Sequence, residues 1–128
     1  TMAQTVWAQP LDADGWPVGE RRVFLDFTGT DIYPDGAVID AEGNFCNAQW
    51  GKSRVAVYAP DGTFLREHAV GAPHSSCPAW GGPDLTTLYC TTALEEMSEE
   101  AKAACPDAGK TFAIPNAGRG LPEPRVLL

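Results

Sequence analysis

The sequence predicts an all-β protein built from the four-stranded blades of a β-propeller, with one short helical insertion near residues 94–104. Three observations lead to this fold class. Short β-rich segments alternate with tight turns, the turns carry glycine at the position that needs a positive φ, and the pattern of strands and turns repeats at a spacing of one blade.

The predicted strands are rich in valine, isoleucine, phenylalanine, tyrosine and threonine, which favour extended backbone. We expect strands at residues 5–8, 23–27, 37–40, 45–50, 54–58, 63–67, 87–91 and 111–114. In residues 54–58 the side chains alternate, with Val55 and Val57 on one side, which favours a sheet with one covered face. The turns between strands include Asp14-Gly15, Asp35-Gly36, Gly43-Asn44, Trp50-Gly51 and Asp61-Gly62.

The helical insertion rests on a segment rich in glutamate and alanine that ends before Pro106. Thr92 and Glu95 have the spacing of a capping box, so Thr92 is the predicted N-cap. Its four glutamates could be taken for a metal cluster, but we interpret them as a solvated face: Glu95, Glu96, Glu99 and Glu100.

The repeat sets the number of blades. Gly15 and Gly62 are 47 residues apart, and Cys46 and Cys90 are 44 apart, within the repeat length of about 40–50 residues that propeller blades have. A chain of 128 residues then holds fewer than three blades, whereas closed rings need about 4–8. We therefore expect the chain to be a fragment of a longer protein or to close a ring with a second copy.

Composition excludes some functions. The net charge is −8 and the basic residues are scattered, which argues against a nucleic-acid partner. No apolar run approaches the roughly 20 residues of a membrane helix, and the start lacks a signal-peptide pattern. We therefore expect no membrane partner, a cytoplasmic location and reduced cysteines. Cys46 and Cys90 are predicted to be buried thiols, with a disulfide or a reactive nucleophile as alternatives.

One segment carries a family resemblance. Residues 33–45, with Pro34-Asp35-Gly36, Asp40 and Gly43-Asn44, resemble the PDG-x-x-x-D-x-x-G-N-x-W signature of the gluconolactonase/regucalcin (senescence marker protein) family. Residues 47–62 and 76–89 are similar to the continuation of that family, and residues 118–122 resemble its C-terminal end. Cys46 departs from the pattern, because the family usually has tryptophan there.

The resemblance implies that residues 1–128 are the C-terminal half, about three blades, of a six-bladed propeller that hydrolyses a sugar lactone. It also implies one divalent metal ion, calcium or zinc, with magnesium or manganese as further options. In the family a glutamate, an asparagine and the aspartate of the PDG motif hold this ion. The aspartate carries over to Asp35, and the other ligands fall before Thr1, as do the substrate-contacting arginine and asparagine of the family.

Lactone hydrolysis explains why Asp35 is our predicted catalytic residue as well as metal ligand. Water attacks an ester carbonyl, a divalent cation polarises that carbonyl, and a carboxylate beside it accepts the proton of the water. We expect Pro34 and Gly36 to form a tight turn that points the carboxylate into the channel. By itself the tripeptide could be only a turn, which is how we interpret Asp61-Gly62.

Other candidates are weaker. His74 lies in a predicted loop, residues 71–76, where it could contact substrate or simply be a surface residue, and His68 is expected to be exposed on an outer hairpin. Ser75 and Ser76 lack the GxSxG context of a nucleophile, although Ser76 could line the channel. Asp40 is expected to have a structural role in the turn before Gly43.

Three functional hypotheses remain from the sequence. The chain is an enzyme fragment whose missing N-terminal half supplies the other ligands, or it closes a ring with a second copy of itself. The third is a non-catalytic propeller module that binds a protein. For the first two the expected partner is a small sugar lactone.

Overall fold

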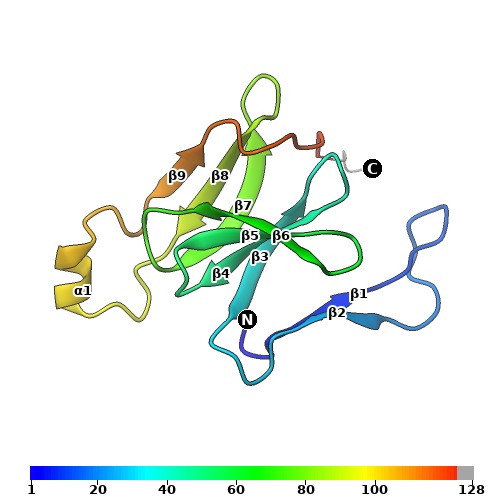
Figure 1. Cartoon of the computed structure of the whole chain (residues 1–128), viewed down its shortest axis with the longest axis horizontal. Helices are drawn as coiled ribbons and strands as arrows, with labels where there is room; N and C mark the ends of the chain where they lie inside the picture. The colour runs from blue at the N-terminus through cyan, green and yellow to red at the C-terminus, as the bar shows by residue number, and fades with distance from the viewer. Residues whose placement is uncertain (124–128) are drawn as a thin grey trace.

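The computed structural model describes residues 1–123, which form three antiparallel sheets and one short helix (Figure 1). The sheets have two strands, β1 (Thr5–Ala8) and β2 (Arg22–Asp26), then four, β3 (Tyr33–Ile39), β4 (Phe45–Trp50), β5 (Arg54–Tyr58) and β6 (Phe64–Ala69), then three, β7 (Ser75–Gly81), β8 (Thr87–Thr92) and β9 (Thr111–Ile114). Helix α1 (Glu99–Ala104) lies between β8 and β9. The predicted all-β class is confirmed.

Each sheet follows chain order, so consecutive strands pair as hairpins. Glycines with positive φ occupy the tight turns, such as Gly43 at 83° between β3 and β4 and Gly62 at 90° between β5 and β6. Only the four-stranded sheet is a complete blade within the described residues. β9 therefore ends its sheet one strand short, and β1 and β2 make half a blade.

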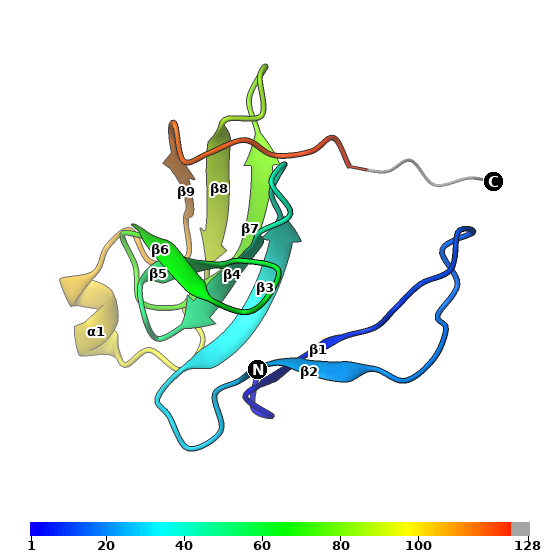
Figure 2. The ribbon, with the colours of Figure 1, turned by 45° about the vertical axis from the view of Figure 1, so that its right-hand side comes forward.

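The complete blade is covered on both faces, because a neighbour packs on each side (Figure 2). Val55 and Val57 of β5 lie in a core shared with Trp80, Leu88 and Cys90 of the three-stranded sheet. Ala56 and Tyr58 of β5 point the other way. They lie in a second core with Leu25 of β2 and with Phe27, which follows β2. The prediction of one covered face was therefore wrong, since a propeller blade is sandwiched between two others.

The Pro34-Asp35-Gly36 segment is not the tight turn that we predicted. It lies inside β3, where the pairing with β4 slips between Pro34 and Ala37 and forms a bulge. Gly36 is required there by packing rather than by a turn. A Cβ on Gly36 would lie 2.7 Å from the carbonyl oxygen of Ser76 and 2.9 Å from Cα of Cys77, both in β7.

The helix is shorter than predicted, and its N-cap is a different residue. Thr92 ends β8, where its hydroxyl donates to the carbonyl of Lys110 and accepts from the backbone N–H of Gly109. Ser98 is the N-cap, with its Oγ accepting from the N–H of Ala101 at 3.2 Å. Helix α1 has six residues, and residues 1–123 hold no helix long and apolar enough to cross a membrane.

The four cysteines are free thiols. Cys46 and Cys90 are fully buried, as predicted. Burial raises the pKa of Cys46 to about 12 and that of Cys90 to about 11. Neither is therefore a thiolate at neutral pH, which argues against either as a nucleophile.

Candidate functional site

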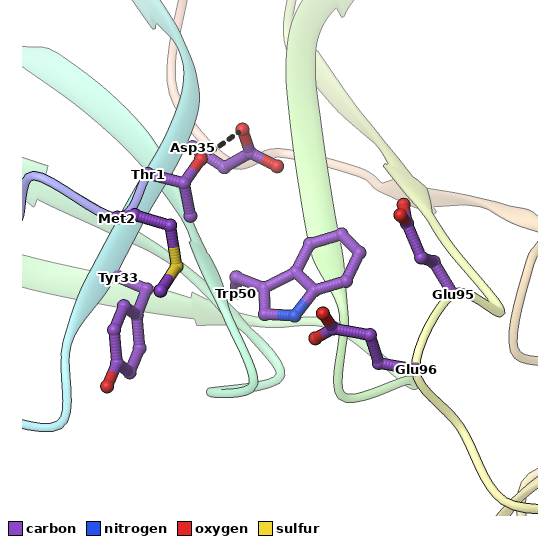
Figure 3. Close-up of a pocket in the computed structure, with 7 residues that line it drawn as sticks. All are labelled: Thr1, Met2, Tyr33, Asp35, Trp50, Glu95 and Glu96. Atoms are coloured by element: carbon purple, nitrogen blue, oxygen red, sulfur yellow. Dashed lines mark hydrogen bonds between the residues drawn. The ribbon is translucent and has the colours of Figure 1, made fainter.

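Asp35 lies in a pocket of about 570 Å³ where three parts of the chain meet (Figure 3). The first residues, the neighbouring ends of β3 and β4, and the loop after β8 supply its lining. The lining residues are Thr1, Met2, Tyr33, Asp35, Trp50, Glu95 and Glu96. Residues from these three parts are far apart in sequence, so the pocket is a product of the fold.

The backbone around Asp35 is held by a buried side chain. Asn47 of β4 is fully buried, and its Nδ2 donates to the carbonyls of Asp35 at 3.1 Å and Gly36 at 3.2 Å. These two carbonyls belong to the bulge, where the regular strand pairing is interrupted. Asn47 thereby replaces lost ladder bonds and fixes the direction in which the Asp35 side chain leaves the strand.

The Asp35 carboxylate is partly exposed to the pocket. Thr1 Oγ1 donates to Asp35 Oδ1 at 3.0 Å, as the dashed line in Figure 3 shows. Within residues 1–123 this is the hydrogen bond that the carboxylate makes, so its second oxygen is free to accept from a water or substrate.

The pocket brings Glu95 and Glu96 to the same side of the molecule as Asp35. Nevertheless, no group of three or more His, Cys, Asp or Glu side chains within residues 1–123 is placed to hold a metal ion. Asp35 can offer one hard oxygen ligand of the kind that calcium prefers. All four glutamates are exposed, as predicted, and Glu99 pairs with Lys102 at 2.7 Å.

Trp50 is a pocket residue that we did not predict. It ends β4, faces Tyr33 across the strand pair, and forms an isolated bridge with His74. The rings of Trp50 and His74 are stacked, with centroids 4.4 Å apart and planes 12° from parallel. His74, for which the sequence left substrate contact and a surface position open, stacks on Trp50 and is not among the residues that line the pocket.

The remaining sequence candidates are structural. Asp40 is buried in the turn before Gly43, as predicted, and accepts from the backbone N–H groups of Glu42 and Asn44. Asp61 is a turn residue that accepts from the N–H of Thr63.

The last three candidates from the sequence are His68, Ser75 and Ser76. His68 was predicted to be exposed but is half-buried in β6, which lowers its pKa through desolvation. Ser75 is fully buried, and Ser76 bonds to Thr91 of the adjacent strand and does not line the pocket.

Comparison with known proteins gives consistent matches. The family model described as the SMP-30/Gluconolactonase/LRE-like region matches residues 1–94. A putative sugar lactone lactonase of Rhizobium meliloti (strain 1021) is 41% identical over 116 residues, which cover 91% of this chain and 40% of that protein. The 6-deoxy-6-sulfogluconolactonase of Pseudomonas putida is 37% identical over 125 residues, which cover 97% of this chain and 43% of that protein.

A solved structure agrees. The calcium-binding protein regucalcin from Agrobacterium tumefaciens str. C58 superposes with a TM-score of 0.88 at 38% identity, over 98% of this chain and 44% of that one. The chain therefore spans about two fifths of the length of the relatives that it matches.

Proposed function

Because this chain belongs to the SMP-30/gluconolactonase/LRE-like family, we propose that it forms part of a propeller that hydrolyses a sugar lactone. The observation that carries the proposal is the placement of Asp35, whose carboxylate opens into a pocket of about 570 Å³. Several relatives are lactonases, which supports lactone hydrolysis as the general chemistry.

In this proposal Asp35 is the general base. The free oxygen of its carboxylate accepts a proton from the water that attacks the lactone carbonyl. The two hydrogen bonds from buried Asn47 hold the bulge, so that the carboxylate keeps its direction during the reaction. The pocket is large enough for one sugar ring, since small-molecule sites have volumes of about 300–1,000 Å³.

We also propose Asp35 as one ligand of a divalent cation, calcium or zinc, with magnesium or manganese as further options. When bound, such a cation would polarise the lactone carbonyl and stabilise the developing oxyanion. In this proposal the remaining ligands come from outside residues 1–123, within which no group of three or more His, Cys, Asp or Glu side chains is placed to hold a metal ion.

The source of those ligands is proposed to be the missing N-terminal part of a longer protein, of which residues 1–128 are the C-terminal half. Two observations support this. The chain spans about two fifths of its relatives, and its first and last sheets are incomplete blades. A second copy of the chain is the alternative partner, and a cytoplasmic location stays a prediction.

The test is hydrolysis of D-glucono-1,5-lactone with calcium, zinc or no metal added. It is run on the 128-residue chain at several concentrations and on the same chain preceded by the N-terminal part of its longer parent. We expect metal-dependent hydrolysis in the completed protein, lost in Asp35→Asn and retained in the matched control Asp61→Asn, which alters an exposed turn. Hydrolysis that survives Asp35→Asn would refute the assignment of Asp35.

The concentration series separates the two partners. Hydrolysis by the 128-residue chain that rises steeply with its concentration, together with a dimer in solution, would assign the missing ligands to a second copy. Metal-independent binding of a protein partner, unchanged by Asp35→Ala and without hydrolysis in any form, would support the non-catalytic module instead.

A further inference from the structure

We propose that Trp50 is a substrate-binding residue, whose indole face supports the sugar ring of the lactone beside Asp35. This inference rests on the proposed lactonase function and deepens it, because it names a residue that positions the substrate.

The position of Trp50 follows from the strand pair that carries Asp35. Trp50 is the last residue of β4 and lies opposite Tyr33, which is two residues before Asp35 in β3. Figure 3 shows the indole near the centre of the lining residues, with Tyr33 and Met2 on one side and Glu96 and Glu95 on the other. A ring that lies on this indole is therefore held within the pocket that the Asp35 carboxylate enters.

His74 holds the indole in one orientation. The stacked imidazole covers one face of Trp50, and the isolated bridge between the two residues fixes their backbones side by side. The indole is only partly buried and still lines the pocket. A large apolar surface that is already fixed in place loses little conformational entropy when a ligand covers it.

An aromatic face suits a sugar ring. The face of an indole carries partial negative charge, whereas the C–H bonds on one side of a sugar ring carry partial positive charge and present an apolar surface. A lactone ring is also flattened by its planar ester group. Its hydroxyl groups point outward from the ring, and the pocket lining supplies Thr1, Glu95 and Glu96 as polar partners for them.

The experiment titrates D-glucono-1,5-lactam, an uncharged analogue that is not hydrolysed as an ester, into the ¹⁵N-labelled 128-residue chain. The readout is the indole N–H signals of the tryptophans, with that of Trp50 assigned by its loss in Trp50→Phe. Trp16, which is 71% exposed between β1 and β2 and is not a lining residue of the pocket, is the internal control.

We expect a saturable shift of the Trp50 signal and none at Trp16. Trp50→Leu, which removes the aromatic face, should weaken binding about tenfold or more, and Trp50→Phe should remain within about threefold. No saturable shift at Trp50, or equal binding by a folded Trp50→Leu variant, would overturn the proposal, and the wild-type titration decides if that variant does not fold.

Its failure is distinguishable from failure of the proposed function. Lactam binding at Trp50 without Asp35-dependent hydrolysis in the completed protein would refute the lactonase assignment alone. Asp35-dependent hydrolysis without any contact at Trp50 would refute the inference alone.

Discussion

Gly36→Ala should destabilise the chain through the contact between β3 and β7. The added Cβ would meet the Ser76 carbonyl oxygen at 2.7 Å and Cys77 Cα and Sγ at 2.9 Å, whereas ordinary contacts are about 3.5–4.0 Å. Two of these three atoms are backbone, so the strands must separate. Overpacking of this kind costs about 1–3 kcal/mol. With an m-value of about 2 kcal/mol per M, the urea midpoint should fall by about 0.5–1.5 M.

The assay is urea unfolding of the 128-residue chain, with Ala37→Ser, an exposed change in the same strand, as a control expected to stay within about 0.5 kcal/mol. A Cys77→Ala background removes the Sγ contact but leaves both backbone contacts, so it should recover less than half of the loss. A Gly36→Ala variant as stable as the wild type would refute the reasoning that β3 and β7 are in close backbone contact.

Two further predictions concern stability. Asp40→Ala should lower the free energy of unfolding by about 2–4 kcal/mol, because it leaves the buried N–H of Asn44 and the partly buried N–H of Glu42 without their acceptor. Urea unfolding measures the loss, and a change below about 0.5 kcal/mol would contradict it. Cys46 and Cys90 stay protonated in the folded chain until about pH 12 and about pH 11, whereas unfolded thiols ionise near pH 8.5. The folded state therefore holds more protons above about pH 8.5, and stability should fall as the pH rises through this range; flat urea midpoints there would contradict the raised pKa values.

Strands with strong local signals were predictable. Residues 45–50, 54–58 and 111–114 form β4, β5 and β9 at the predicted bounds, because β-branched and aromatic side chains there agree with their burial in the sheets. β7 was missed, because its sequence contains two serines and Pro78 and has little intrinsic strand preference. Pro78 is tolerated because β7 is the end strand of its sheet, so the missing N–H of proline leaves no strand pairing unmade.

The helix start shows the limit of local patterns. Thr92 and Ser98 both have a hydroxyl group suited to an N-cap, and only the tertiary structure determines which of them caps the helix. Thr92 is drawn into β8 by its bonds to Lys110 and Gly109, residues far along the chain, and the helix begins after Ser98 instead.

The site was predictable only where a motif marks it. Asp35 stood out through its resemblance to a family signature, since by residue type alone it differs little from Asp61. Trp50, Glu95 and Glu96 line the pocket because the fold brings distant segments together. No local pattern in the sequence predicts which distant segments meet.

The placement of Asp35 supports the proposal that activity belongs to an assembly. β3 and β7 are the first strands of their sheets, and they pack closely enough that Gly36 leaves no room for a Cβ. Asp35 is thus on a strand that begins a blade, beside the strand that begins the next one. In a ring of such blades every first strand faces the same central space, so each blade can contribute only one or two groups to a site there. In the proposed function the other groups come from blades outside residues 1–123, so that completing the ring would create the site.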